Sequence, residues 1–552
     1  MALFALAHAL VRLPARAQEA PRPQPSQPGA AATAGAPDTA GVEGKTIGAV
    51  HIVTQNIFDP AKPGESRRLF RLANHLHFTT RPEVIRRQLL FHAGDPFSTE
   101  AVRESERLLR ANPYFYDVAI RPAGSSGDKV DVSVVTRDVW TLQGGASYNH
   151  AGGANTGELE IEDVNFLGTG KDLILAHRAN VDRRSNLFRY RDPNLFGSRA
   201  LLDFHLSSNS DGHARLLDLE HPFFALDTRW AAGMTAYQNQ QIDRLYFGGE
   251  IADRFRQRHD FAELFAGFSP GLVDGATQRW RLGYTYDRSR FAPAAGFPAA
   301  AATPADRTLG YPWIGYDYIE DGFVTVRDLD RIQRTEDLNL GRQLSLRLGW
   351  SARAFGGDSG QLVFKSKAAD AWTPTPRQTL LATASLAGRL RAGLVENGLV
   401  GAALRYYARD LGKNLFYFSV SGNAALRLDP ETQLLLGGDN GLRGYPLRFQ
   451  AGDRRFLATL EQRFYGEREY LHLLHLGAAV FFDAGSAWFV EPNPAQPLEA
   501  NRRILKDIGA GLRICSSRSA GGSVVHFDLA FPLDRTRSLK ALQILISTGE
   551  TF

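Results

Sequence analysis

The amino-acid sequence predicts an all-β transmembrane barrel that follows one small α+β domain. Apolar and polar residues alternate with a period of two from about residue 140 to the end of the chain, and no helical period persists there. The 552 residues are 43% hydrophobic, yet the sequence has no uncharged apolar run of about 18 residues, as a membrane helix requires. A transmembrane barrel fits both observations, because its strands present apolar side chains to lipid and polar ones to the interior.

The first 44 residues are expected to precede the folded domains. Residues 1–17 have the features of a signal peptide, with an apolar stretch at Ala2–Val11 and small residues at a cleavage-site spacing around Arg16. Residues 18–44 are rich in Pro, Ala and Gly without periodicity, which predicts a disordered linker. The single cysteine, Cys515, excludes an intrachain disulfide framework. The net charge of +5 comes without a basic block, so nucleic acid is not an expected partner.

Residues 45–138 are expected to form the small α+β domain. The segment Thr80–Glu83 resembles a helix capping box with Pro in the first turn, and Ser98 or Thr99 is placed to cap a second helix. The predicted order is β-α-α-β-β, which folds compactly as an antiparallel sheet with both helices on one face. The expected elements are a strand at 48–54, helices at 82–91 and 99–110, and strands at 116–121 and 130–137.

Residues 139–552 are expected to form the barrel. In the segment 278–287, Trp280 and Leu282 share one face, and Arg279 and Arg281 share the other. A soluble β-sandwich is the alternative, but about 400 residues of continuous β pattern exceed its usual size. The apolar faces also end in aromatic residues, as the girdles of a membrane barrel do. The first strand is expected at 139–149 and the last at 542–552.

Three short segments resemble motifs of enzymes or ligand sites, but the residues around them do not support such a site. Gly357–Gly360 reads GDSG but has no cysteine-flanked histidine in the chain, so we interpret it as a barrel turn. Gly168–Lys171 lacks the first Gly and the final Ser or Thr of a phosphate-binding loop. His472 and His475 would lie on opposite faces of a strand. We therefore expect no catalytic residue, no metal site, no cofactor and no enzyme activity.

Three elements near the C-terminus are complementary in charge. The Gly-rich loop 437–446 carries one arginine, Arg443, within the motif Gly441-Leu442-Arg443-Gly444-Tyr445. The alternation places Glu461 on the polar face of one strand and Asp483 on the polar face of another. Polar faces point into the barrel, so an arginine entering from a loop would meet carboxylates on the inner wall. Such a buried pair is geometrically specific, and loss of one partner leaves an uncompensated charge.

The sequence resembles the BamA/TamA superfamily of bacterial surface antigens, in which POTRA (polypeptide-transport-associated) domains precede an outer-membrane barrel. The POTRA pattern matches 84–120, and barrel motifs match NFLGTGK at 165–171, GLRGY at 441–445 and FFDAG at 481–485, together with the terminal Phe552. The resemblance covers residues 45–552. It departs from the assembly factors in having one POTRA domain, where they carry three or five.

The resemblance implies a barrel of about sixteen strands in the outer membrane of a Gram-negative cell, with the POTRA domain in the periplasm. It implies that Arg443 pairs with Asp483, with Glu461 as a second carboxylate, and that this clasp is needed for activity. It also implies a seam between the first strand, which carries Gly144 and Gly145, and the last, which ends at Phe552. The expected partners are outer-membrane lipids, unfolded client polypeptides and periplasmic accessory proteins.

The predicted function is assembly of outer-membrane proteins or translocation of polypeptides, with client strands templated at the POTRA edge and at the seam. Glycines weaken strand pairing, which would let the seam open. A dedicated secretion transporter for one partner and a passive pore or structural protein are the alternatives. Lipid transport is a fourth class without a sequence signal of its own.

Overall fold

The computed structural model describes residues 41–62, 64–151, 154–180, 182–294, 303–409, 414–438, 440–490, 503–522, 524–534 and 539–548. The expected signal peptide, most of the expected linker and Phe552 lie outside these residues. Residues Pro37–Phe552 form one compact unit. No helix in the described ranges is long and apolar enough to cross a membrane.

The N-terminal domain is a three-stranded sheet with helices, in the strand order β1-β3-β2. β1 pairs with β3 in parallel, and β2 pairs with β3 antiparallel, so β1 and β2 are the two edges. Its core contains Ile85, Leu109, Val132 and Val134, which are fully buried. The elements are β1 (Thr46–Gln55), α2 (Arg68–Leu76), α3 (Pro82–Gln88), α4 (Thr99–Arg110), β2 (Phe115–Ser126) and β3 (Lys129–Asp138).

Three features of this domain differ from the sequence prediction. The sheet is mixed rather than antiparallel, because a long helical connection follows β1 and lets β1 pair with β3 in parallel. The capping box at 80–83 does not form, because the Thr80 hydroxyl donates to the buried carboxylate of Asp138 at 3.1 Å instead of capping α3. Helix α2 is an additional element between β1 and α3. By contrast, Ser98 caps α4 as expected, and its hydroxyl accepts from the Ala101 amide at 3.3 Å.

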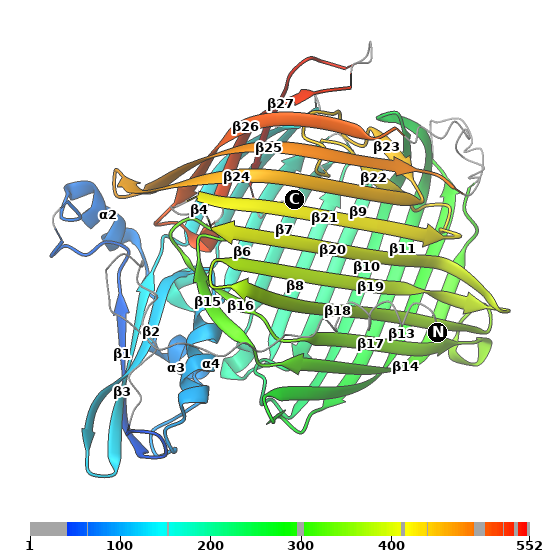
Figure 1. Ribbon diagram of the computed structural model, residues 1–552. Coiled ribbons are helices and arrows are strands. Elements are labelled where there is room, and N and C mark those ends of the chain that lie inside the picture. Colours follow the sequence, from blue (N-terminus) through cyan, green and yellow to red (C-terminus); the bar gives the residue numbers. More distant parts are fainter. Residues whose placement is uncertain are drawn as a thin grey trace, which may run out of the picture. The chain divides into compact units, whose positions relative to one another are not determined.

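Most of the remaining described chain forms an antiparallel barrel (Figure 1). Each barrel strand pairs with the next barrel strand along the chain, and β28 adjoins β4 to close the barrel. The first ten strands are β4 (Leu142–Ala151), β5 (Ala154–Asp163), β6 (Asp172–Ala179), β7 (Arg184–Asp192), β8 (Leu201–Asn209), β9 (Gly212–His221), β10 (Trp230–Phe247), β11 (Glu250–Phe268), β13 (Ala276–Pro293) and β14 (Arg307–Glu320). The second ten are β17 (Gln343–Ser351), β18 (Gln361–Thr375), β19 (Gln378–Arg391), β20 (Leu394–Arg409), β21 (Asn414–Leu426), β24 (Arg454–Tyr470), β25 (Leu474–Trp488), β26 (Leu505–Ser516), β27 (Val524–Pro532) and β28 (Gln543–Thr548).

The barrel has more strands than the resemblance implies. The described residues form twenty barrel strands of six or more residues, besides the two-residue β12 (Leu272–Val273). Chain length alone allows this number, because several hairpins are tight: only two residues separate β8 from β9, and two separate β18 from β19. The first strand begins at Leu142 rather than at Val139. The preceding backbone is held by the turn between β26 and β27, where the Trp140 amide donates to the Arg518 carbonyl at 2.6 Å.

The outer and inner faces of the barrel differ as the alternation predicts. On β13, Trp280 is 48% exposed and Leu282 is 65% exposed, whereas the intervening Arg281 is partly buried. On β27, Phe527 and Leu529 are exposed, but Asp528 between them is 1% exposed. A closed barrel with an apolar outer face and a polar inner face satisfies its backbone groups internally, which is the requirement for spanning a membrane.

Two long connections carry short sheets of their own. The lumen loop, residues 427–453, joins β21 to β24 and contains β22 (Leu434–Leu436) paired with β23 (Gln450–Gly452). The hairpin segment, residues 321–342, joins β14 to β17 and contains β15 (Phe323–Arg327) paired with β16 (Thr335–Asn339). Counted along the chain, these connections leave opposite rims of the barrel, because the chain crosses the barrel five times between them, an odd number, through β17, β18, β19, β20 and β21.

Candidate functional site

The lumen loop is anchored by apolar side chains at the base of its motif. Leu436, Leu442 and Tyr445 are fully buried and pack with Ala487 and Leu505 of the barrel wall. The Tyr445 hydroxyl donates to the Lys506 carbonyl at 2.8 Å. Burial raises the pKa of Tyr445 above its ordinary value, so the hydroxyl keeps the proton that it donates. These contacts fix the loop to the wall on both sides of Arg443.

Two glycines of the motif are required by the close approach of the loop to the wall. Gly441 has φ of 108°, and a Cβ atom there would lie 2.2 Å from Leu457 Cδ2. A Cβ atom at Gly444 would lie 2.6 Å from Asp507 Cβ, and the Gly444 amide donates to Asp507 Oδ2 at 3.0 Å. Side chains at these two positions would push the loop off the wall.

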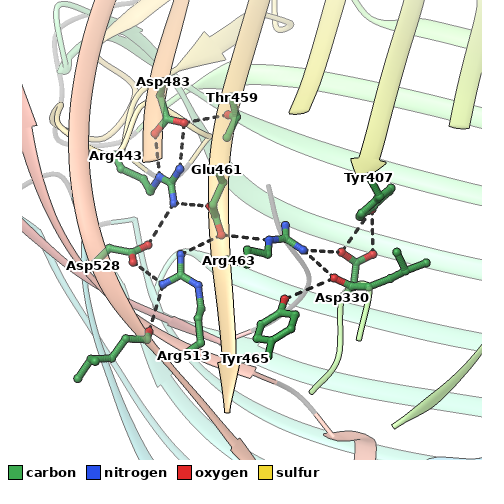
Figure 2. A network of polar contacts seen from close by, with 12 residues as sticks. Asp330, Tyr407, Arg443, Thr459, Glu461, Arg463, Tyr465, Asp483, Arg513 and Asp528 are labelled. Carbon is green, nitrogen blue, oxygen red and sulfur yellow. Dashed lines mark hydrogen bonds and ion pairs between the residues drawn. The ribbon is translucent and has the colours of Figure 1, made fainter. Parts of the chain in front are cut away.

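Arg443 lies between the two carboxylates that the sequence singles out. Its Nε and Nη2 atoms donate to the two oxygens of Asp483 at 2.8 and 3.0 Å, and its Nη1 atom donates to Glu461 Oε2 at 3.1 Å (Figure 2). The guanidinium also stacks on the Phe481 ring, 3.3 Å from the ring centroid. The side chains of Arg443, Glu461 and Asp483 are at most 3% exposed. We call these three residues the clasp.

Further charged residues extend the clasp along the inner wall. Glu461 also accepts from Arg463 at 3.2 Å and from Arg513 at 3.3 Å, and Asp528 lies between Arg443 and Arg513 (Figure 2). Arg463, Arg513 and Asp528 were not among the site residues predicted from the sequence. The alternation of the sequence could have identified them, because each lies on the inward face of its strand. Arg463 follows Glu461 by two residues on β24, Arg513 is on β26, and Asp528 is on β27.

The clasp and the charged residues that extend it connect four neighbouring strands of the wall. Glu461 is on β24, Asp483 on β25 and Asp528 on β27, while Arg513 on β26 links Glu461 to Asp528. Arg443 of the loop therefore contacts residues on three strands, and the last of these strands, β27, is the neighbour of β28. Breaking a buried ion pair of this kind leaves an uncompensated charge at a cost of about 3–5 kcal/mol.

The hairpin segment reaches the same network from the opposite rim. The Leu329 carbonyl accepts from Arg463 Nη1 at 2.7 Å, and Asp330 lies 3.3 Å from the same atom. The Tyr407 hydroxyl on β20 donates to Asp330 Oδ2 at 3.2 Å, and Figure 2 shows this branch leading away from Glu461. The hairpin segment and the lumen loop are thus joined through Arg463 and Glu461.

The hairpin segment also contacts the N-terminal domain. Arg110 at the end of α4 forms a two-point ion pair with Asp337 on β16, with distances of 2.7 and 3.0 Å. Arg334 donates to the Ser519 carbonyl at 2.9 Å and stacks on Tyr116 of β2, 5.0 Å from the ring centroid. A chain of contacts therefore runs from the N-terminal domain through the hairpin segment to the clasp.

The remaining expected residues lie elsewhere. Gly144 and Gly145 are in β4, where they pair with Ile161 and Glu160 of β5, and Phe552 is outside the described residues. The GDSG sequence falls in the connection between β17 and β18, and Gly168–Lys171 falls in the turn between β5 and β6. Within the described ranges, no group of three or more His, Cys, Asp or Glu residues is arranged to hold a metal ion. The site is a set of ion pairs and hydrogen bonds that can lock a loop.

Comparison with known proteins identifies the N-terminal domain. Residues 77–137 match the family model of POTRA, the surface antigen variable number repeat. No curated protein sequence matches the chain significantly. Among solved structures, BamA from Haemophilus ducreyi lacking POTRA domains 1–3 is 14% identical with a TM-score of 0.38, over 91% of this chain and 85% of that one. CdiB from Escherichia coli is 12% identical with a TM-score of 0.44, over 91% and 76%. The strand pairings of the chain itself define its barrel.

Proposed function

We propose that this chain, a POTRA-bearing outer-membrane barrel of the BamA/TamA superfamily, assembles outer-membrane proteins or translocates polypeptides by templating client strands. The POTRA domain lies on the periplasmic side. The proposal needs no ATP and no covalent step, because strand pairing and burial of apolar side chains in lipid would drive the client forward.

The observation that carries the proposal is the position of the clasp relative to the closing strands. Arg443 contacts wall residues on β24, β25 and β27, and β28 pairs with β27 on one side and adjoins β4 on the other. A loop that fixes β24 to β27 as a unit would let β28 and β4 separate without loss of the neighbouring register. A passive pore has no need of such a lock.

The POTRA sheet offers an edge for an extended client. β2 is partly covered, because the Ile120 amide donates to Glu106 and the Phe115 carbonyl accepts from Arg334. β1 is the other edge. Its start is also covered, because Ile47 exchanges main-chain hydrogen bonds with Gly94 and Asp95, but Val53 further along the strand is 47% exposed. Addition of a strand to an edge uses main-chain hydrogen bonds, so it accepts clients of varied sequence. We therefore assign client docking to β1.

A photo-crosslinking amino acid tests this docking site. Placed at Val53, it should capture unfolded client polypeptides in the periplasm. The control is Arg103, an exposed position on α4, where the same probe should capture none. Equal capture at the two positions would show that β1 has no special role.

The proposal is tested at the level of the whole cell by comparing outer-membrane and secreted proteomes with and without this protein. Loss of many unrelated barrels from the membrane is the expected result for an assembly factor. Loss of one secreted protein would identify a dedicated secretion transporter, which is the second candidate. Unchanged proteomes would contradict both and favour a structural or lipid-related role.

A further inference from the structure

Helix α2 is not explained by the POTRA fold. It precedes the residues that match the family model and lies between β1 and α3. Its inner face is firmly held, because Phe70 stacks on Phe58 with ring centroids 4.3 Å apart and meets the His472 ring edge-on at 6.2 Å. His472 belongs to the turn between β24 and β25, so α2 is packed against the POTRA-side rim of the barrel.

The outer face of α2 is a stripe of leucines. Leu69, Leu72 and Leu76 are 68%, 52% and 58% exposed, and Phe78, just beyond the helix, is 61% exposed. Spacings of three and four residues place the leucines on one side of the helix. An exposed apolar stripe on a short, well-packed helix marks a contact surface rather than part of the protein core.

The leucine stripe continues the lipid-facing surface of the barrel. Leu76 and Phe78 line an apolar pocket together with Leu142, Ile161 and Leu175 of β4, β5 and β6. These three barrel residues are 48%, 59% and 50% exposed. The α2 surface therefore extends the apolar band of the barrel at the rim next to β4.

A basic stripe flanks the leucines. Arg68, Arg71 and His75 recur at intervals of three and four residues and are exposed, and Arg67 precedes the helix. The helix contains no acidic residue, and the nearby Glu65 is buried against Arg137 and Arg518. A leucine stripe bordered by arginines is the pattern of a helix that lies in a membrane interface, with its apolar side toward the acyl chains and its charges among anionic headgroups.

We propose that α2 binds the periplasmic leaflet of the outer membrane, with the leucine stripe in the interfacial region and Arg68 and Arg71 near lipid phosphates. This inference rests on the membrane placement of the barrel and goes beyond its proposed function. The exposed arginines and the continuity of the leucine stripe with the barrel surface favour lipid as the partner of this helix. Binding there fixes the POTRA domain beside β4, where the proposed seam lies.

Depth-dependent quenching tests the inference on the full-length protein in vesicles of phosphatidylethanolamine and phosphatidylglycerol. A fluorophore is attached at Leu72→Cys after replacement of the buried Cys515 by Ser. Lipids with a nitroxide near the headgroup should quench this fluorophore. A label at Ile161→Cys, on the outer barrel surface, is the positive control. A label at Asp128→Cys, in the turn between β2 and β3 at the opposite end of the sheet from α2, should remain unquenched.

The outcomes separate the inference from its premise. Quenching at Ile161 without quenching at Leu72 would overturn the lipid contact while the barrel remains in the membrane. Absence of quenching at both positions would overturn the membrane placement and the inference with it. Quenching of the Leu72 label by aqueous iodide would show a water-exposed stripe and direct attention to a polypeptide partner instead.

The charge and apolar contributions are tested separately. Arg68→Gln and Arg71→Gln should each weaken the lipid contact about fivefold in vesicles with phosphatidylglycerol and have little effect in vesicles of phosphatidylcholine alone. Leu69→Gln with Leu76→Gln should abolish quenching at position 72 in both vesicles. Heat-modifiable migration on gels verifies that each variant barrel is folded. Undiminished quenching in all variants would contradict the inference.

Discussion

Glu461 and Arg463 stand two residues apart on β24, and through this pair the lumen loop meets the hairpin segment that leaves the opposite rim. Glu461 accepts from Arg443 of the loop at 3.1 Å and from Arg463 at 3.2 Å, and Arg463 donates to the Leu329 carbonyl of the hairpin segment at 2.7 Å. The hairpin segment in turn pairs with α4 through Asp337 and Arg110. The clasp is therefore connected to the POTRA domain as well as to the wall.

Replacing the clasp arginine is the direct test of the lock. Arg443→Ala leaves the buried Asp483 without its cation and removes one of the three arginines that contact Glu461, which should destabilise the docked loop by about 3–5 kcal/mol. We expect protease cleavage within residues 427–453 and loss of client assembly. Arg443→Lys keeps the charge but cannot form the two-point contact with Asp483, so partial function is expected.

Arg448→Ala is the matched control for this variant. Arg448 is in the same loop and pairs with Asp182, but both side chains are partly exposed near the barrel rim. Its loss should have a smaller effect on the loop and little on client assembly. Normal client assembly in Arg443→Ala cells would support the passive-pore alternative.

The connection through Arg463 predicts communication between the clasp and the hairpin segment. Arg463→Gln removes the charge-assisted donor to Leu329, and such hydrogen bonds contribute about 1.5–3 kcal/mol. Amides at 329–331 should therefore exchange about 10- to 100-fold faster with deuterium.

Arg513→Gln provides the comparison for Arg463→Gln. Arg513 also contacts Glu461 and is equally buried, but its described contacts are to Glu461, Asp528 and the Leu512 carbonyl rather than to the hairpin segment. Exchange at 329–331 should remain close to that of the unmodified protein. Equal acceleration in both variants would mean that the hairpin responds to general loosening of the wall.

The parts of the site that lie on strands could be predicted, because a period of two fixes which side chains point inward. This alternation predicts that Glu461 and Asp483 point inward. It predicts the same for Asp528, which was not among the predicted site residues. The pairing of Arg443 with the wall came from the family resemblance. Parity identifies the candidates on each strand, but it does not specify which of them a loop will contact.

The hairpin segment and α2 could not be predicted in the same way. The hairpin contacts join Arg463 to residues more than 130 positions earlier in the chain, and no local pattern indicates such a pairing. Helix α2 has only nine residues, which is shorter than the window of about 11–18 residues over which a helical period can be recognised in a sequence. The strand number exceeded the implied sixteen because the family pattern, not the chain length, supplied that number.

Glu336 gives the hairpin segment a predicted pH dependence. Its carboxylate accepts from the Leu329 amide at 2.9 Å, yet burial raises the pKa of Glu336 to about 7. The folded hairpin then binds this proton more tightly than the unfolded chain, so its stability is highest at low pH and falls as the pH rises from about 4.5 to about 7.

Hydrogen exchange at pH 5 and pH 8, corrected for intrinsic exchange rates, measures this dependence. Protection at 329–331 should be greater at about pH 5 than at about pH 8. The Gln side chain in Glu336→Gln resembles the protonated carboxyl and keeps an oxygen acceptor. Protection of the amides at 329–331 in this variant should therefore differ little between the two pH values. A variant with the same pH dependence as the unmodified protein would assign the effect to another group.

The seam is tested by the two glycines of β4. Gly144 and Gly145 pair with β5, and β4 adjoins β28 at the closure of the barrel. Replacing both with Val should favour strand pairing by about 1 kcal/mol or more and hold the seam closed. We expect slower client assembly with an unchanged or raised unfolding temperature of the barrel itself.

Gly422→Val on β21 is the control for the β4 variant. Its added side chain would meet only ordinary contacts, at a position far along the sheet from β4. If the β4 variant assembles clients at the normal rate, opening between β4 and β28 is not part of the mechanism.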